Sequence, residues 1–243
     1  MRPLGAARWR LTFAAGQARR QNAVVTIDDE KRAAAEAAAA LVQDGMAVGL
    51  GTGSTVAYFL PALARRQLRL RCVATSPATA AAASALGLAI EPFDHLARLD
   101  LAVDGADQVA PDGWLVKGGG GAHTRERIVA AAARRFVVIV SSDKPVAALR
   151  PPVPVELVAF GLPATLARLG DVRLRDRRSP DGGVLADWFG PLDDPAVAAA
   201  RLDATPGVVD HGLFEPSLTS DVLVAGAAGV EHRRVGGPVD RSP

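Results

Sequence analysis

The sequence predicts an α/β protein, in which a Rossmann-like, mostly parallel sheet domain is joined by a second, smaller α+β (ferredoxin-like) domain. Up to residue 140, short apolar segments alternate with helical segments, and each apolar segment is hydrophobic throughout rather than at every second residue. Such strands are buried on both faces, as in a parallel sheet with helices on each side. After a proline-rich stretch at 150–154, the order of segments changes to α+β.

The elements of the sheet domain follow in chain order. Thr26 is the expected N-cap of a helix that runs to Gln43, because acidic residues fill the first turn and Asp44-Gly45 ends it. Strands are expected at 46–50, 71–75, 99–103 and 135–140, with a weaker candidate at 89–92, and helices at about 55–63, 78–86 and 125–134.

The second half supplies the smaller domain. Helices are expected at 163–169 and 194–202, and strands at 172–175, 184–188 and 208–214, while the apolar segment 220–226 returns to the first sheet. We therefore expect a flexible N-terminal extension (1–24), a catalytic α/β domain (25–148 plus about 218–235), a small α+β domain (149–217) and a loose tail (236–243).

Composition is that of an ordinary globular protein. The 243 residues, 49% hydrophobic and 22% charged, suit one large or two small domains with a buried core. No apolar run approaches the roughly 20 residues that span a bilayer, so no membrane partner is expected. A single cysteine, Cys72, leaves no internal disulfide and fits a reducing, cytoplasmic location.

The first 24 residues differ from the rest in charge. They contain five arginines and no acidic residue, whereas the remainder has 23 basic and 26 acidic residues. That balance gives no support for nucleic-acid binding by the folded part. The extension has the composition of a targeting peptide, but an unstructured extension or a start site placed too far upstream also fits, and we expect it to be dispensable.

One segment concentrates charged groups around glycine. Asp104-Gly105-Ala106-Asp107, Lys117, four glycines from Gly118 to Gly121, and Glu126 fall within 23 residues. Glycine lets backbone N–H groups approach an oxyanion, because no Cβ blocks the approach. Charged groups beside such a turn suit proton transfer on a small polar substrate. The segment is therefore the predicted active site.

Three polar segments follow directly after predicted strands, namely 51–55, 104–107 and 141–144. Ligands bind beyond the carboxyl ends of parallel strands, so all three are expected on one edge of the sheet. Gly51-Thr52-Gly53-Ser54-Thr55 also opens a helix, whose N–H groups and dipole favour an anion. Taken singly, this loop fits a tight turn equally well, the two aspartates fit turn caps, and Glu126 fits a dipole partner.

The use of lysine adds an independent argument. Only three of the 28 basic residues are lysine, at Lys31, Lys117 and Lys144, and the others are arginine. A compact ammonium and a guanidinium are not interchangeable at a tight site. Lys117 precedes the glycines, Lys144 follows a strand on the predicted edge, and Lys31 opens the first helix, so we expect all three to be functional.

The histidines and the cysteine form no metal-binding pattern. His123 and His211 have neither a catalytic partner nor metal-ligand spacing nearby, and Cys72 lies in an apolar strand. We therefore expect no metal and no cofactor, with both histidines structural and Cys72 in the core.

Four motifs now occur together and in order: 51–55, 104–107, Lys117-Gly-Gly-Gly-Gly-Ala-His-Thr-Arg-Glu126, and 206–214. From about residue 27 to 235 the chain resembles ribose-5-phosphate isomerase of the A type, and the lysine-to-glutamate spacing is the most specific part. The resemblance implies an aldose–ketose isomerase that interconverts D-ribose 5-phosphate and D-ribulose 5-phosphate in the non-oxidative pentose phosphate pathway. It further implies metal-free catalysis and a homodimer or homotetramer.

The resemblance also implies roles by matching position. Glu126 would be the base that moves a proton between C1 and C2 of the open-chain sugar, while Asp104, Asp107 and Lys117 assist ring opening and stabilise the enediolate. Phosphate would lie against 52–55, with charge from Lys31 and Lys144. The implied substrate-binding residues are Lys31, Thr52, Gly53, Ser54, Thr55, Asp104, Gly105, Ala106, Asp107, Lys117, Gly118, Gly119, Gly120 and Lys144.

Some positions depart from the family pattern. Gln108 stands where the family usually has Glu, His123 replaces an apolar residue, and 141–144 and 179–183 vary two usual turns. None removes a proposed proton-transfer group.

Two other functions stay open: an isomerase of another sugar phosphate, and a non-catalytic sugar-phosphate sensor. A sensor is expected to carry a helix-turn-helix, for which residues 1–24 are too short, and Glu126 with Lys117 favours an enzyme.

Overall fold

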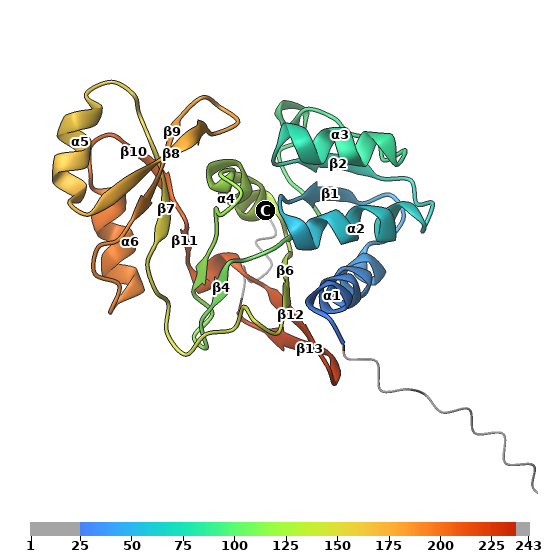
Figure 1. Cartoon of the computed structure of the whole chain (residues 1–243). Coiled ribbons are helices and arrows are strands. Elements are labelled where there is room, and N and C mark those ends of the chain that lie inside the picture. The colour runs from blue at the N-terminus through green and yellow to red at the C-terminus, as the bar shows by residue number, and fades with distance from the viewer. Residues whose placement is uncertain (1–24, 237–243) are drawn as a thin grey trace, which may run out of the picture.

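The computed structural model of the protein describes residues 25–236 (Figure 1). Its larger sheet has six strands in the order β13-β12-β6-β3-β1-β2, and every neighbouring pair is parallel except β12 with β13. The strands are β1 (Ala47–Leu50), β2 (Arg71–Ala74), β3 (Leu101–Asp104), β6 (Phe136–Ser141), β12 (Asp221–Gly226) and β13 (Gly229–Arg234). The predicted mostly parallel α/β sheet is confirmed. The predicted extension 1–24, and the predicted tail beyond its first residue, lie outside the described residues.

Helices cover both faces of this sheet. α1 (Ile27–Leu41) and α2 (Ser54–Ala64) pack on one face, and α4 (His123–Ala132) on the other, while α3 (Pro77–Ala85) lies beside β2. Along β6, Val137 and Ile139 belong to the core under α1 and α2, whereas Val138 and Val140 belong to the opposite core. Burial on both faces explains why these strands are apolar at every position.

The start of α1 is the capping box that the sequence predicts. The Thr26 hydroxyl accepts from the backbone N–H of Asp29 at 3.2 Å, and the Asp29 carboxylate accepts from the N–H of Thr26 at 3.1 Å. The helix ends at Leu41, two residues before the predicted end. Its buried face is almost all alanine, with Glu30 as the exception, and this lets the helix lie close to the sheet.

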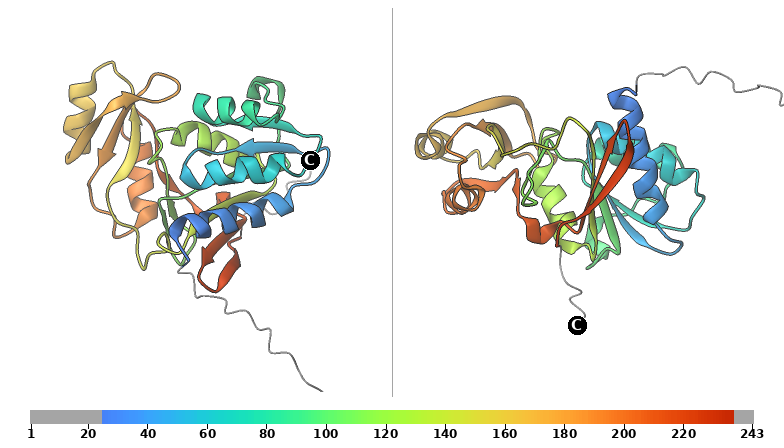
Figure 2. Two further views of the ribbon diagram at one scale, coloured as in Figure 1. Left: turned by 45° about the vertical axis from the view of Figure 1, so that its right-hand side comes forward. Right: turned by 90° about the horizontal axis from the view of Figure 1, so that it is seen from below.

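The smaller sheet is antiparallel throughout, in the order β10-β7-β9-β8. Its elements are β7 (Val153–Leu157), α5 (Leu162–Leu169), β8 (Val172–Arg178), β9 (Val184–Trp188), α6 (Pro195–Asp203) and β10 (Val208–His211). This β-α-β-β-α-β succession is the predicted ferredoxin-like arrangement, built around the fully buried Trp188. Two further views show the small sheet and its helices beside the larger domain (Figure 2).

A third sheet lies between these two and was not predicted. It joins β11 (Leu213–Phe214), β5 (Leu115–Val116) and β4 (Gln108–Val109) in antiparallel order. Two-residue strands are too short to show a hydrophobic period. Two short 3₁₀ segments, Phe93–His95 and Pro216–Leu218, complete the described chain.

The prediction of one strand over 208–214 is wrong at Gly212, where the chain leaves β10 and enters β11. A Cβ on Gly212 would lie 2.1 Å from the carbonyl oxygen of Lys117, so only glycine fits this crossing. Gly212 also donates to the carbonyl of Pro154 and accepts from the N–H of Lys117. The small sheet and the predicted active-site segment are therefore joined at this residue.

Other differences concern short or proline-containing segments. The weak strand candidate 89–92 forms only one isolated bridge, from Ile90 to Cys72. β7 begins inside the proline-rich stretch, and Pro154 fits because its missing N–H lies beyond the end of β10. β13 was not predicted, because all its residues are exposed and its sequence lacks the apolar pattern by which a strand is recognised.

Candidate active site

A cavity of about 120 Å³ lies beyond the carboxyl ends of β1, β3 and β6, where the sequence places the three polar segments. It is lined by Thr52, Gly53, Ser54, Thr55, Gly105, Ala106, Asp107, Lys117, Gly118, Gly119, Gly120, Glu126 and Lys144. Twelve of the fourteen predicted substrate-binding residues are among them, joined by the predicted base, Glu126. Asp104 lies directly beneath the cavity, and Lys31 lies outside its lining.

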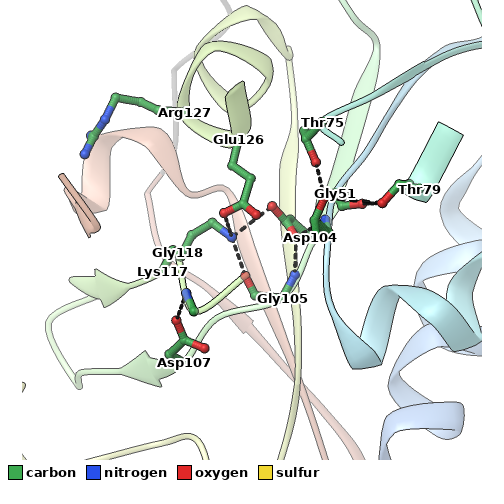
Figure 3. Close-up of polar contacts among 12 residues, drawn as sticks. Gly51, Thr75, Thr79, Asp104, Gly105, Asp107, Lys117, Gly118, Glu126 and Arg127 are labelled. Atoms are coloured by element: carbon green, nitrogen blue, oxygen red, sulfur yellow. Dashed lines mark hydrogen bonds and ion pairs between the residues drawn. The ribbon is translucent and has the colours of Figure 1, made fainter. Parts of the chain in front are cut away.

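A buried ammonium held between two carboxylates lies in this site (Figure 3). The Nζ of Lys117 is 2.9 Å from Asp104 Oδ2 and 3.1 Å from Glu126 Oε2, and it donates to the carbonyl of Gly105 at 2.6 Å. Each of these three charged side chains is no more than 3% exposed. Interactions between charges are strong here because water is nearly absent.

Three different elements bring these side chains together. Asp104 is the last residue of β3, Lys117 follows β5, and Glu126 lies in the first turn of α4. The Phe214 ring of β11 makes a cation–π contact with Lys117, whose ammonium lies 5.3 Å from the ring centroid. The geometry therefore depends on the large sheet, the connecting sheet and α4 at once.

Burial and mutual repulsion shift the ionisation of the three groups. Desolvation, followed by repulsion from Asp104, raises the pKa of Glu126 to about 8, although Lys117 opposes the shift. Desolvation also raises the pKa of Asp104. Burial disfavours the charged form of Lys117, but Asp104 and Glu126 outweigh it and raise the pKa of the ammonium. Lys117 thus stays protonated, while the carboxylates hold a proton near neutral pH.

The glycine turn carries Asp107 on its outer side. The N–H of Gly119 donates to Asp107 Oδ2 at 2.8 Å, and the turn closes through a bond from Gly121 N–H to the Gly118 carbonyl at 2.9 Å. Gly118 has φ +97° and Gly121 has φ +76°, a backbone region that other residues rarely adopt. These values explain why the segment requires glycine at both ends of the turn.

The loop after β1 is bound to the same carboxylate. Thr52 N–H donates to Asp104 Oδ1 at 3.0 Å, and a Cβ on Gly51 would lie 2.1 Å from that oxygen. Asp104 therefore connects the loop to Lys117. Behind the loop, the Thr52 hydroxyl lies 2.8 Å from that of Thr75 and 3.2 Å from that of Thr79. The sequence did not single out these two threonines, of which Thr75 is the last residue of the predicted strand 71–75 and Thr79 lies in the predicted helix 78–86.

The start of α2 and Lys144 form the other end of the cavity. α2 begins at Ser54, and its first N–H groups have no partner within the helix. No side chain caps this end, since Gly53 precedes it with φ +134°. Lys144, 34% exposed, lies 2.9 Å from Asp143. Open N–H groups beside an ammonium have the charge and the donors that an anion such as phosphate requires.

Lys31 is the one predicted site lysine that the structure places apart from the cavity lining. Its Nζ lies 3.4 Å from Asp28 in the first turn of α1. The neighbouring Glu30 is the residue that reaches the predicted edge, because its carboxylate accepts from Ser142 N–H at 2.8 Å. This bond anchors α1 to the end of β6.

Gln108, a departure from the family pattern, is not part of the cavity lining. Its amide donates to the carbonyl of Arg150 at 2.8 Å and accepts from the N–H of Arg150 at 2.8 Å. A carboxylate can only accept, so glutamine satisfies both backbone groups where glutamate satisfies one. Gln108 therefore fixes the chain at Arg150, in the segment that connects the two larger sheets.

His123 and His211 also lie outside the cavity lining. His123 is fully buried at the start of α4, and burial lowers its pKa to about 3. His211 accepts from Leu213 N–H through Nδ1, and its Nε2 lies 3.2 Å from Asp203. Cys72 is buried in β2, and burial raises the pKa of its thiol to about 11. These contacts are those of structural residues.

Within residues 25–236, no group of three or more His, Cys, Asp or Glu side chains is arranged to hold a metal ion. The helices of this part of the chain are also too short or too polar to cross a bilayer. The expectation that catalysis needs no metal or cofactor stays a prediction.

The fold and the cavity together define a class of protein. At the carboxyl ends of a parallel sheet, one cavity is lined by a helix start with open N–H groups and by a buried glutamate with a pKa near 8 beside a lysine. A tuned carboxylate suits a general base, and a fixed ammonium suits a developing oxyanion. The class is an enzyme that moves protons on a small phosphorylated substrate.

Comparison with known proteins specifies the class. Residues 71–229 match the family described as ribose 5-phosphate isomerase A (phosphoriboisomerase A). A relative from Caulobacter vibrioides (strain NA1000 / CB15N), named ribose-5-phosphate isomerase A, is 44% identical over 85% of this chain and 98% of its own. A relative of the same name from Synechococcus sp. (strain JA-3-3Ab) is 42% identical over 87% of this chain and 99% of its own.

Solved structures agree. Ribose 5 phosphate isomerase A from Neisseria gonorrhoeae superimposes with a TM-score of 0.84 at 29% identity, covering 88% of this chain and 99% of that one. A D-ribose-5-phosphate isomerase in complex with phospho-erythronic acid gives 0.81 at 32% identity, covering 86% and 99%. The chain belongs to the ribose 5-phosphate isomerase A family, and its activity is the interconversion of ribose 5-phosphate and ribulose 5-phosphate.

Proposed function

We propose that Glu126 is the base of this isomerase and transfers one proton between C2 and C1 of the open-chain sugar phosphate. The observation that carries this assignment is the position of Glu126 on the cavity wall, 3.1 Å from Lys117, with a pKa raised to about 8. A base with a pKa near the working pH both accepts and returns a proton efficiently.

The proposed reaction is balanced within the site. Glu126 removes the proton from C2 of the aldose, the C1 carbonyl oxygen gains the negative charge, and an enediolate forms. The hydroxyl proton moves from O2 to O1, and Glu126 returns its proton to C1 to give the ketose. The Lys117 ammonium stabilises the charge on oxygen throughout, and it is available because its pKa is raised.

Asp104 and Asp107 have different proposed tasks. Asp104 is buried under the cavity and fixes both Lys117 and the N–H of Thr52, so it positions rather than reacts. Asp107 lies on the cavity wall and is exposed, where it can exchange a proton with the ring oxygen or the anomeric hydroxyl during ring opening.

The phosphate is assigned to the start of α2. Ser54 and Thr55 supply N–H and hydroxyl donors there, and the dipole of α2 favours a negative charge. Lys144 supplies the nearby positive charge and would exchange Asp143 for the phosphate. Lys31 acts over a longer distance, through its charge alone.

One structural relative supports this orientation. It was solved with phospho-erythronic acid, a four-carbon acid that carries a phosphate. A carboxylate on that skeleton has two coplanar oxygens, as an enediolate has. We expect this chain to bind the same class of compound, with the carboxylate at Lys117 and the phosphate at the start of α2.

We further propose that the protein is cytoplasmic and forms a homodimer or homotetramer. Its one cysteine supports a reducing compartment. Ile128 and Val209, which are 53% and 48% exposed, line the same surface hollow between α4 and β10. Apolar side chains gathered in this way favour contact with another protein surface. Light scattering should give a mass of two or four chains, and Ile128→Asp should lower it, whereas a monomeric wild type would contradict the proposal.

The experiment that tests the function is a coupled isomerase assay with EDTA present. Wild-type protein should interconvert ribose 5-phosphate and ribulose 5-phosphate with undiminished turnover, and a panel of other pentose and hexose phosphates should react more slowly. Loss of activity in EDTA would contradict metal-free catalysis. Faster turnover of another sugar phosphate would transfer the assignment to that substrate.

A further inference from the structure

We propose that Arg175 and Arg177, two arginines of the small ferredoxin-like domain, are positioning residues that orient the glycine turn 118–121 in the active site. Both lie on β8, and each donates a hydrogen bond to a backbone carbonyl of the turn. The inference rests on the proposed function, because it assigns that turn to substrate binding.

Arg175 is a fixed donor. Its guanidinium is held by Asp187 through Nε at 3.0 Å and Nη2 at 2.5 Å, and its Nη1 donates to the Gly118 carbonyl at 2.9 Å. The side chain is only 15% exposed. A planar guanidinium held at two nitrogens has one orientation, so its remaining donor fixes the Gly118 carbonyl in space.

Arg177 fixes the next peptide group. Its Nη2 donates to the carbonyl of Gly119, and its Cζ lies 3.6 Å from the position that a Cβ would take on Gly121. Leu185 of the same small sheet also packs on Gly121, with its Cδ1 2.6 Å from that position. Two consecutive carbonyls of the turn are thus drawn toward the small domain.

The orientation of the carbonyls decides where the N–H groups point. In a trans peptide the C=O and the N–H point in opposite directions. The peptide of Gly118 and Gly119 lies between Arg175 on its carbonyl and Asp107 on its N–H. In the next peptide, Arg177 holds the Gly119 carbonyl, so the N–H of Gly120 points to the opposite side, toward the cavity that Gly120 lines.

The same domain also holds the other end of the segment. Glu156 of β7 is 3% exposed and accepts from the Thr124 hydroxyl at 2.6 Å, two residues before the proposed base. A hydrogen bond from Ser179, in the β8–β9 connection, fixes Glu156 in turn. Side chains of the small domain therefore contact the segment both at the glycine turn and at Thr124, and through these contacts they set the distance between the turn and Glu126.

The test compares Arg177→Ala, Arg177→Lys and Arg175→Lys with Arg178→Ala, a control at the exposed end of the same strand. In full-length protein, Arg177→Ala should lower kcat about tenfold and weaken inhibition by phospho-erythronic acid about tenfold, because the turn no longer presents its N–H correctly. Inhibition by inorganic phosphate should not change, since phosphate binds at α2. Arg177→Lys should restore part of the loss, and Arg175→Lys should resemble Arg177→Ala.

Thermal melting of each variant separates positioning from folding. The inference is overturned if the arginine variants keep wild-type kcat, or if inhibition by phosphate weakens as much as inhibition by phospho-erythronic acid. It is also overturned if Arg178→Ala loses as much turnover as Arg177→Ala. An inactive wild type would instead overturn the proposed function, so the two failures are distinguishable.

Discussion

At the scale of single residues, one ammonium shared by two buried carboxylates decides the chemistry. Lys117 neutralises one negative charge, and the second remains in a site with almost no water. Asp104 accepts from Lys117 and from two backbone N–H groups, at Thr52 and Gly105, which favour its charged form. Among residues 25–236, the Glu126 carboxylate has the ion pair with Lys117 but accepts from no backbone N–H, so fewer groups favour its charged form.

The raised pKa of Glu126 predicts a pH dependence of activity. A base must be deprotonated to act, so kcat/KM should fall about tenfold per pH unit below an apparent pKa near 8 and level off above it. Because Asp104 and Glu126 are coupled, the value belongs to the pair. A pH profile with fully ionised substrate checks this, and a plateau reaching down to pH 5 would contradict it.

His123 predicts a stabilising substitution. Its ring is fully buried, and among residues 25–236 neither nitrogen makes a hydrogen bond of good geometry; the backbone of Asp210 opposes the lowering of the His123 pKa but only partly offsets burial. His123→Leu should raise the free energy of unfolding by about 1–3 kcal/mol, because it replaces unsatisfied polar atoms with an apolar side chain of similar size. Urea melts at pH 7 check this, and a destabilised variant would show that the ring has a partner in solution.

The same histidine makes stability depend on pH. The pKa of His123 is about 3 in the folded protein and about 6.5 in an exposed histidine, so the folded protein contains His123 in its neutral form. Above a pH of about 6.5, His123 does not lower the free energy of unfolding. As the pH falls from about 6.5 toward 3, the free energy of unfolding decreases, because His123 binds a proton in the unfolded chain but not in the folded protein. His123→Leu should flatten this part of the stability profile, and an unchanged slope would contradict the account.

Gln108 predicts a loss of stability without loss of chemistry. Gln108→Glu removes the donor to the Arg150 carbonyl and places a carboxylate against it, which should cost about 1–2 kcal/mol. kcat should stay unchanged, because Gln108 does not line the cavity. Chemical denaturation and steady-state kinetics on one preparation separate the two effects, and a changed kcat would place Gln108 in the site.

At the scale of elements, the site depends on how the loops and side chains at the ends of neighbouring strands pack against each other. Gly51 ends β1 where Asp104 ends β3, and there is no space for a Cβ between the loop and that carboxylate. Gly51→Ala should displace Asp104, release Lys117 and lower kcat about a hundredfold.

A matched control for this element is Gly226→Ala, at the end of β12. A Cβ there would meet only Ser142, at an ordinary 3.5 Å. It should leave kcat unchanged. Kinetics of both variants check the prediction, and equal activity of Gly51→Ala and wild type would show that the loop can shift without affecting Asp104.

At the scale of the whole molecule, the sequence was informative where strands are buried on both faces. Continuous apolar segments predicted β1, β2, β3, β6 and β12, and the rule that ligands bind at their carboxyl ends predicted that three distant loops converge. Residue type and spacing were enough to single out Glu126 and Lys117. The role of each site residue stays a prediction.

The remaining features depend on contacts that no local pattern encodes. β4, β5 and β11 are two residues long, and β11 pairs with β5 just after Gly212, a crossing at which no Cβ fits. Arg175 and Arg177 lie on a mostly exposed strand, so in sequence they resemble solvated surface residues. For Lys31, the rarity of lysine predicted a place at the site; its ammonium lies beside Asp28, outside the cavity lining, and its role stays a prediction.

Glu126→Gln tests the central claim most directly. The amide keeps the shape of a side chain that is often neutral in the free enzyme, so folding and inhibition by phospho-erythronic acid should be retained. Turnover of ribose 5-phosphate should fall by about 10² to 10⁴, because the amide cannot accept the C2 proton. Turnover close to that of the wild type would contradict the assignment of Glu126 as the base.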